Sequence, residues 1–476
     1  MDDALRLLHS FRNLSQPVNR FPPEILSRII RYVTHEDGTD ALLTISLTRV
    51  CRYWREFIIS TPRNWTSISN RYKNLAELSL QRAKAAPLKI DLDMYQFRWK
   101  SKFSRLINPY VQNIKTIHFS GFEKVKDLKQ SLPNFPQSVP NLQSLTLAKY
   151  KHASQESHSI DPCESLAPSL KYLKLVGVPL CHSFLRLRAL TELNFNVHWL
   201  DFHLDTLLDF LEENHSLQIV TLGIRFREPS LRHSQRGTAI MNRLQHLSIN
   251  TPDAMDGKAL ISNIVLRRGA HLELVIGTHK RLKDLLPGTP PTQLSNLLSP
   301  IFMECQYKSR SINIQLRGPN GSFSFQEFYE GEKPSVESHL LPLTSVREFR
   351  LIHPKSAQVS SRHDVFNPSF FPALEALAVA CGTWASHVLS NLLSNPSFPP
   401  SLKTLAFLNC NLSGDFMEEL TRFASDRKNT TSAQLRRVVI IDSQGNLPTI
   451  ASIDTLGEHV PIVDIRVGKE LPTDLT

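Results

Sequence analysis

The stretch LKTLAFLNCNL at residues 402–412 has apolar side chains at its first, fourth and sixth positions, and this spacing recurs along most of the chain. Because 41% of the residues are hydrophobic, roughly 30 such patterns would arise by chance. The period is more informative: copies step by 28 residues twice from Ile114, by 27 twice from Leu190 and by 28 twice from Val346. The copies lie at residues 142–147, 170–175, 190–195, 217–222, 244–249, 346–351, 374–379, 402–407 and 435–440.

Steps of 27 and 28 residues lie within the range of about 20 to 29 that is typical of leucine-rich repeats. Each copy is expected to form a short strand, and each interval a helix or a turn. One strand and one helix cannot shield their apolar faces alone, but stacked units form a continuous core. We therefore predict an irregular leucine-rich-repeat-like α/β solenoid over residues 69–470.

The side chains between the last two apolar positions of each copy are expected to line the concave face of the solenoid, opposite the leucines. They change from polar to small along the chain, which predicts a flatter and more accommodating surface toward the later copies. The candidate target-binding residues are Thr146, Lys174, Asn194, Thr221, Ser248, Arg350, Ala378 and Ala406.

The stretch at residues 311–328 departs from this rhythm. Apolar and polar residues alternate on both sides of GPNG at residues 318–321. Such alternation around a glycine-containing turn predicts a β-hairpin, inserted into the solenoid or extending it.

The sequence FPPEILSRIIRYV at residues 21–33 predicts a helix near the start of the chain. Its prolines suit a first helical turn, and Glu24 lies near the positive end of the helix dipole. A second helix is expected to begin at residue 41 and to continue until Thr61 and Pro62. The apolar residues at helical spacing are Ile25, Leu26, Ile29, Ile30 and Val33 in the first helix, and Val50, Trp54, Phe57 and Ile58 in the second.

The opening at residues 21–26, VCRYWR at residues 50–55 and PRNW at residues 62–65 together resemble the F-box, over roughly residues 20–68 and after a leader of residues 1–19. In F-box proteins this three-helix module docks onto an SKP-type adaptor and links a substrate receptor to a cullin-RING ubiquitin ligase. The chain departs from the family at Phe21, where leucine is usual. The resemblance assigns adaptor contacts to Phe21, Pro22, Ile25 and Leu26, and contacts or module core to Val50, Cys51 and Trp54.

The segment LQRAKAAPLKI at residues 80–90 resembles the one that follows the F-box in many proteins from mushroom-forming fungi. With the F-box and the degenerate repeats, this resemblance covers most of the chain. It implies an F-box protein with weak leucine-rich repeats, of the kind expanded in those fungi.

Motifs of several enzyme classes are absent from the sequence: the P-loop, the dinucleotide-binding glycines, the nucleophile elbow and HExxH. The six cysteines include no CxxC pair. We therefore expect no catalytic residues, no cofactor and no metal site. With no apolar run of about 18 residues and two acids near the start, we expect a protein of the cytoplasm, the nucleus or both, without a membrane partner.

The formal net charge of +11 is compatible with nucleic acid or with acidic proteins as partners. The basic residues are dispersed, and neither an RNA-recognition motif nor a helix-turn-helix signature is present. We therefore favour acidic protein partners over nucleic acid.

Two hypotheses follow. The first is a non-catalytic substrate receptor of an SCF-type cullin-RING ubiquitin ligase, whose F-box binds the SKP-type adaptor, and through it cullin, and whose repeats bind an unknown target protein. The second is a repeat-based scaffold or interaction protein in which the F-box-like helices only cap the core of the solenoid.

Overall fold

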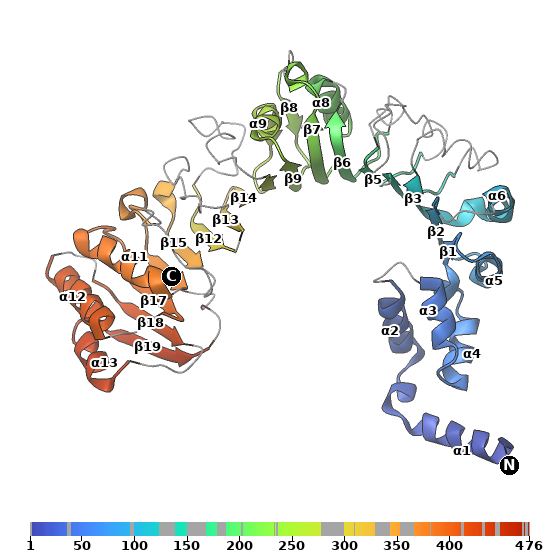
Figure 1. The fold of residues 1–476 in the computed structure, drawn as a ribbon, viewed down its shortest axis with the longest axis horizontal. Helices are drawn as coiled ribbons and strands as arrows, with labels where there is room; N and C mark the ends of the chain where they lie inside the picture. Colours follow the sequence, from blue (N-terminus) through green and yellow to red (C-terminus); the bar gives the residue numbers. More distant parts are fainter. Residues whose placement is uncertain are drawn as a thin grey trace. The chain divides into compact units, whose positions relative to one another are not determined.

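The computed structural model divides into two compact units, Met1–His198 and Trp199–Thr476, which are described one at a time (Figure 1). Their elements alternate between strands and helices, and the strand pairs are mostly parallel. Each described helix is too short or too polar to cross a membrane. The structure describes residues 2–35, 40–95, 100–122, 139–149, 168–178, 187–200, 203–232, 234, 237–277, 299–308, 310–328, 343–352, 366–380, 382–410, 414–430, 434–442, 448–468, 471 and 475.

The first unit begins with helices. The expected leader of residues 1–19 contains a helix and most of a turn of 3-10 helix, and the helix expected within residues 21–33 is present. The elements are α1 (Asp2–Ser15), η1 (Pro17–Arg20), α2 (Pro23–His35), α3 (Asp40–Leu47), α4 (Arg52–Ser60) and η2 (Pro62–Trp65).

The expectation of one continuous helix from residue 41 to 60 is wrong, because the chain turns between α3 and α4. Cys51 is extended, with φ −156° and ψ 174°, and acts as the N-cap residue of α4. The turn is closed by the guanidinium of Arg55, whose Nε donates to the carbonyl oxygen of Thr48 at 3.0 Å. Helical spacing of apolar residues continues through the break, so periodicity alone did not reveal it.

The rest of the first unit is a parallel sheet with strands in chain order, each paired with the next. Helices connect the early strands. The elements are β1 (Ser67–Ser69), α5 (Lys73–Ala83), β2 (Leu88–Asp93), α6 (Lys100–Ile107), η3 (Asn108–Asn113), β3 (Ile114–Phe122), β4 (Ser144–Lys149), β5 (Tyr172–Val176) and β6 (Glu192–Leu200), within which the division between the units falls.

The second unit continues the same alternation, with pairing order β7-β9-β11-β14-β13-β12-β15-β16-β17-β18-β19 and a separate parallel pair β8–β10. The elements are α8 (Leu204–Glu213), β7 (Ile219–Phe226), η5 (Pro229–Arg232), β8 (Ala239–Met241), β9 (His246–Thr251), α9 (Ala254–Ser262), β10 (Ile264–Leu266), β11 (His271–Ile276), β12 (Phe302–Tyr307), β13 (Ser311–Gly318), β14 (Gly321–Phe328), η8 (Leu343–Ser345), β15 (Glu348–Ile352), η9 (Pro368–Phe370), β16 (Ala376–Ala380), α11 (Gly382–Ser394), β17 (Thr404–Leu408), α12 (Gly414–Thr430), β18 (Arg437–Asp442), α13 (Ile450–Gly457) and β19 (Ile462–Val467).

Each copy of the apolar pattern begins two residues before a strand, and its second and third apolar positions lie in that strand and face the core. Leu145 pairs with Leu173, which pairs with Leu193, and all three are buried. Buried apolar side chains of this size each contribute about 1.5–3 kcal/mol relative to exposure, so the stacked rows hold neighbouring strands together.

The expected hairpin at residues 311–328 is confirmed as β13 and β14. Gly321 has φ +127°, a conformation that a residue with a Cβ rarely adopts, and at Gly318 a Cβ would lie 2.8 Å from the carbonyl oxygen of Ser299. The hairpin completes an antiparallel meander with β12. Within the sheet it lies between β11 and β12, because β14 pairs in parallel with β11, and β12 with β15.

A buried arginine joins α12 to the preceding connection. Arg427 is fully buried, and its guanidinium donates hydrogen bonds to four carbonyl oxygens at 2.7–3.3 Å. Burial lowers the pKa of Arg427 to about 10, so the group stays charged at neutral pH. The acceptors belong to Pro396, Pro399, Pro400 and Leu402, in the segment between α11 and β17.

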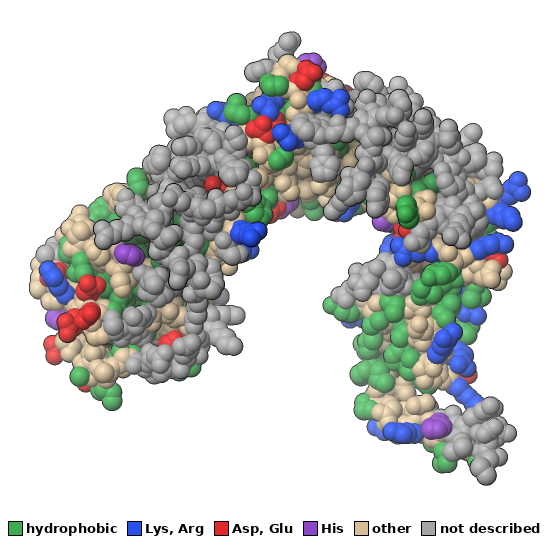
Figure 2. Space-filling view, viewed as in Figure 1, with side chains coloured by type: hydrophobic (Ala, Val, Ile, Leu, Met, Phe, Trp, Pro, Cys, Tyr) green, Lys and Arg blue, Asp and Glu red, His purple; other side chains and the backbone are tan. Residues whose placement is uncertain are grey.

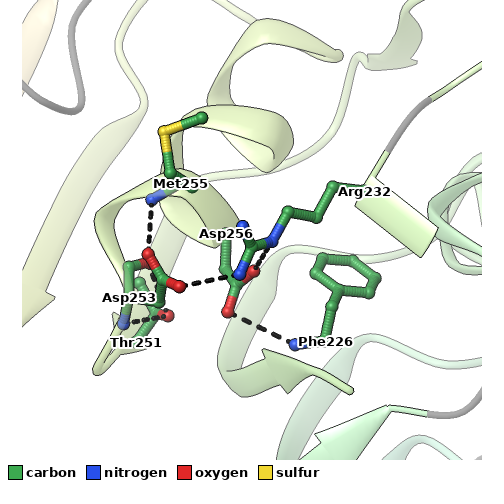
Figure 3. A network of polar contacts seen from close by, with 6 residues as sticks. All are labelled: Phe226, Arg232, Thr251, Asp253, Met255 and Asp256. Carbon is green, nitrogen blue, oxygen red and sulfur yellow. Dashed lines mark hydrogen bonds and ion pairs between the residues drawn. The ribbon is translucent and has the colours of Figure 1, made fainter. Parts of the chain in front are cut away.

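A second polar network fixes the start of α9. Figure 3 shows the guanidinium of Arg232 between two carboxylates: Nε donates to Asp256 at 2.5 Å and Nη2 to Asp253 at 2.7 Å. The other oxygen of Asp256 accepts from the backbone N–H of Phe226 at 3.3 Å, and Asp253 caps α9 by accepting from the N–H of Met255. Burial raises the pKa of the Asp256 carboxyl, while Arg232 acts in the opposite direction. The network thereby ties η5 and the end of β7 to α9.

Candidate functional site

The helices α2, α3 and α4 form a small module with its own core. Leu26 and Ile30, one turn apart on α2, are buried, as are Trp54 and Ile58 on α4. The indole N–H of Trp54 donates to Oδ1 of Asn19 at 2.7 Å, so η1 is attached to α4. These contacts orient α2 so that its second apolar row, which begins at Ile25, faces away from the core.

That second row gives the module an apolar surface. Phe21 is 41% exposed and Ile25 is 40% exposed, and Val33 lies on the same side of α2, two turns after Ile25. Leu42 on α3 and Val50 in the turn before α4 are also exposed. Hydrophobic side chains gather over these helices in Figure 2. Exposed large apolar side chains so close together are typical of a protein-interaction surface.

The seven residues that the sequence assigned to adaptor contacts differ in their solvent exposure. Phe21, Pro22, Ile25 and Val50 are exposed, and Cys51 is partly exposed. Leu26 is fully buried and Trp54 is 8% exposed. The assignment of Leu26 to a contact surface is therefore wrong for this structure, because it packs inside the module. Of the two roles left open for Trp54, the structure shows module core.

The module is attached to the first strands of the sheet. Trp65 is buried, its indole N–H donates to the carbonyl oxygen of Ile58 at 2.8 Å, and the guanidinium of Arg82 on α5 lies 4.3 Å from its ring centroid. The hydroxyl of Thr44 donates to the carbonyl oxygen of Asn64 at 3.4 Å. The expected boundary between residues 68 and 69 falls inside β1, so module and sheet share an element.

Comparison with protein families addresses this module. Residues 18–71 match the F-box-like family model. The chain therefore carries an F-box-like domain, and F-box domains in general bind SKP-type adaptors of SCF ubiquitin ligases. The match begins two residues before the expected start at residue 20 and ends three residues after the expected end at residue 68. A search of curated proteins found no match to the chain.

Beyond the F-box-like domain, the candidate target-binding residues lie on one face of the sheet in each unit. We call this face, opposite the buried leucines, the outer face. Strand register places the predicted residues in continuous rows with residues that the sequence did not single out. The row of the first unit is Asp91, His118, Thr146, Lys174 and Asn194. The row of the second unit is Thr221, Ser248, Glu273, Ser324, Gln315, Glu304, Arg350, Ala378, Ala406, Val439 and Asp464.

An aromatic ring between two arginines marks the middle of the second unit's outer face. The guanidinium of Arg317 lies 4.7 Å from the ring centroid of Phe302, and that of Arg350 lies 5.4 Å from it. Nε of Arg350 also donates to Glu348 at 2.6 Å. Arg350, a predicted target-binding residue, is thus held in place by Glu348 and the ring of Phe302. Its own ion pair leaves it less available to a partner than the exposed Arg317.

Two histidines stack on the outer face of β9 and β11. The rings of His246 and His271 are 4.8 Å apart, and Nδ1 of His271 is hydrogen-bonded to the hydroxyl of Ser322 at 2.6 Å. Glu273 lies 3.7 Å from His246 and Ser324 lies 3.5 Å from His271. Burial, and then the neighbouring His246, lower the pKa of His271, with Glu273 opposing them.

Acidification is expected to destabilise the second unit through His271. The pKa of His271 is lower in the folded chain than its value of about 6.5 in the unfolded chain, so the unfolded chain binds more protons as the pH drops. The free energy of unfolding therefore falls as the pH drops through about 6.5. The melting temperature of the wild type should therefore fall more between pH 7.5 and pH 5.5 than that of His271→Gln. The exposed His203 provides the control, since His203→Gln should keep the wild-type slope. If the melting temperatures of all three proteins fall equally between pH 7.5 and pH 5.5, His271 is not the cause of the acid destabilisation.

The alanines near the end of the outer face differ from the expectation. Ala378 and Ala406 are 0% exposed, whereas the sequence predicted an open and accommodating surface there. Leu475, itself 2% exposed, packs in the same buried cluster. A target therefore cannot contact these two alanines while Leu471 and Leu475 pack in and against this cluster.

The sequence prediction did not include Glu273, Glu304 or the two histidines. The strands of Glu273, Glu304 and His271 do not contain a copy of the apolar pattern, and His246 lies in a copy but not between its last two apolar positions. His246 and His271 are 25 residues apart, and lateral strand pairing alone brings them together. A signal existed in β11, where Leu272, Leu274 and Ile276 alternate with outward residues as expected for a half-buried strand.

Proposed function

We propose that the chain is the target-binding subunit of an SCF-type cullin-RING ubiquitin ligase. In this proposal the F-box-like domain binds an SKP-type adaptor, and through it cullin, while the outer face of the sheet binds a target protein. The observation that carries the proposal is the apolar surface of Phe21, Ile25 and Val50, exposed within a domain whose sequence matches the F-box-like family model. The chain itself performs no catalysis and acts in the cytoplasm, the nucleus or both.

We further propose that the sheet-bearing part is an irregular leucine-rich-repeat-like solenoid, of the kind found with F-boxes in mushroom-forming fungi. Its support is the period of 27 to 28 residues together with parallel pairing of successive strands, for example β15 to β18. The row of side chains on the outer face then offers the target a surface that varies from strand to strand.

The competing proposal is a scaffold in which the helices only cap the sheet. The contact between Trp65 and Arg82, and the position of β1 across the expected boundary, favour such a capping role. Capping does not require Phe21 and Ile25 to be exposed, since a cap buries its apolar surface against the core that it covers. Adaptor binding, in contrast, accounts for the exposed Phe21 and Ile25 and is compatible with a module that is attached to the sheet through Trp65 and β1.

The decisive variant is Ile25→Glu, which places a charge in the centre of the apolar surface. Central anchors of interfaces typically contribute on the order of 2 kcal/mol, so adaptor affinity should fall about thirtyfold, and further when Pro22→Ala is added. Binding of recombinant SKP-type adaptor to the full-length chain would be measured by calorimetry. Because Ile25 is exposed, the melting temperature should hardly change.

Ile450→Glu is the matched control, since Ile450 is an exposed isoleucine on α13 in the other unit. It should leave adaptor affinity at the wild-type value. If Ile25→Glu binds adaptor as tightly as this control does, the ligase proposal is wrong and the scaffold proposal takes its place.

A further inference from the structure

The last strand in the sheet of the second unit has an open edge. β19 pairs in parallel with β18, and among the described strands it has no neighbour on its other side. Figure 1 shows it as the final arrow of this sheet, near α13. The open edge of a strand presents N–H and C=O groups that can pair with a further strand.

The alternation of the backbone determines which residues of β19 present these groups. The N–H of Ile462 donates to the carbonyl oxygen of Arg436 at 3.1 Å, and the N–H of Gly468 donates to that of Asp442 at 3.3 Å. In a parallel pair the N–H and C=O of one residue point to the same neighbour, and successive residues alternate. The residues whose backbone groups face the open edge are therefore Val463, Ile465 and Val467.

This edge lacks the usual protection against pairing. Edge strands are commonly protected by proline, lysine or a bulge. The sequence IVDIRV of β19 contains neither proline nor lysine, and its register with β18 is regular from end to end. Large aliphatic side chains are exposed at both of its ends, since Ile462 is 54% exposed and Val467 is 67% exposed. The strand is therefore suited to accept a partner strand.

Two opposite charges lie at alternate positions of β19, on the outer face. Nη2 of Arg466 lies 2.5 Å from the carboxylate of Asp464, and Nη2 of Arg437 on β18 lies 3.1 Å from it. The hydrogen bond from Arg466 is the main cause that lowers the pKa of Asp464, so this group is ionised at neutral pH. The side chain of Arg466 remains 52% exposed. A partner strand at the open edge therefore meets an acid and a base two residues apart.

We propose that β19 pairs antiparallel with β19 of a second copy of this chain, about a two-fold axis at Ile465. In this register Asp464 lies opposite Arg466 of the second copy, Arg466 lies opposite Asp464 of the second copy, and Val463 lies opposite Val467. The edge-facing N–H and C=O of Ile465 meet those of Ile465 in the second copy. The contact is isologous, so it closes as a dimer.

The charges select this register over its neighbours. An axis at residue 464 places Asp464 opposite itself, and an axis at residue 466 places Arg466 opposite itself. Like charges directly opposite each other destabilise a strand pair, whereas opposite charges stabilise it. Because an antiparallel partner keeps facing side chains on the same side, the outer face of one copy continues into that of the other. The proposal does not depend on the adaptor-binding or target-binding roles.

Sedimentation equilibrium of the full chain measures the dimer. The wild type should dimerise with a dissociation constant on the order of 10 μM, because one strand pair is a small interface. Asp464→Arg sets arginine against arginine, and Arg466→Asp sets aspartate against aspartate, so each variant alone should dimerise at least tenfold more weakly. An equimolar mixture of the two variants should recover the wild-type affinity, since each arginine then faces an aspartate.

Glu419→Arg is the matched control, because Glu419 is exposed on α12, and it should dimerise as the wild type does. The melting temperature of each variant shows whether it is folded. Hydrogen exchange of the wild type covers the case of an unfolded variant: residues 463–467 should be better protected at 100 μM than at 1 μM protein, and residues 239–241 of β8 equally at both. A monomeric wild type at 100 μM, folded single variants that dimerise like the control, or a mixture of folded variants that stays monomeric overturns the proposal.

Discussion

Replacing Arg427 by methionine is expected to lower the free energy of unfolding of the second unit by about 3 kcal/mol or more, the largest loss that we predict for a single side chain. Methionine keeps the length and the apolar contacts of the side chain but has no donors. The carbonyl oxygens of Pro396, Pro399 and Leu402 then lose their charged donor. Buried acceptors without a partner keep the full cost of leaving water.

Thermal unfolding of the full chain measures this effect. For a unit of this size, such a loss corresponds to a fall in melting temperature of about 6 to 12 °C. Arg422→Met is the matched control on the same helix, because Arg422 is largely exposed and only pairs with Asp426 one turn away. It should cost less than about 0.5 kcal/mol. Equal melting temperatures for the two variants would show that the four hydrogen bonds contribute nothing.

Asp256→Asn is expected to cost about 2 kcal/mol, although it preserves shape and removes a buried charge. The two carboxylate oxygens accept from two different donors, Nε of Arg232 and the N–H of Phe226. Asparagine offers one acceptor oxygen, and its amide group points a donor at whichever donor remains. The partly buried guanidinium of Arg232 would also lose its closest counter-charge, Asp256, and keep its ion pair with Asp253.

The measurement is again the melting temperature, with a fall of about 4 to 8 °C expected. Asp454→Asn, at an exposed position of α13, is the control and should change it by less than 1 or 2 °C. Hydrogen exchange at residues 254–262 adds a local reading, since α9 should be the first helix to lose protection. A variant as stable as the control would mean that the charge of Asp256 costs as much as its hydrogen bonds contribute.

The repeated strands could be predicted because their signal is local: two apolar residues at alternate positions and a third two residues before the strand. The strand β12 was not predicted, because its core side chains, Met303, Cys305 and Tyr307, include no leucine. They do occupy alternate positions, as expected for a strand. Which of two adjoining apolar rows on α2 faces inward could not be predicted, since Ile25 and Leu26 are chemically alike and only the packing of α2 within the module, chiefly against α3, distinguishes them.

The outer face illustrates the other limit. Thr146, Lys174 and Asn194 were placed correctly in one row, because strand register follows from the apolar pattern. Ala378 and Ala406 were assigned to the same face, but their cover comes from residues about 70 to 100 positions later. Sequence did hold a hint: ALAVA in β16 and the run from Leu405 to Leu408 in β17 are apolar at consecutive positions, which is typical of a strand buried on both faces.

The hairpin of β13 and β14 has a consequence for the order in which the second unit assembles. Because it lies between β11 and β12, the strands β7, β9 and β11 and the strands from β15 onward can each pair without it, and among the described strands the hairpin and β12 join these two groups into one sheet. Hairpins form within about 1–10 μs from neighbouring residues, whereas β11 and β14 are some 50 residues apart in sequence. Joining the two groups thus requires two non-local pairings, β14 with β11 and β12 with β15, so the closure entropy of both connections must be offset before this unit has one continuous sheet.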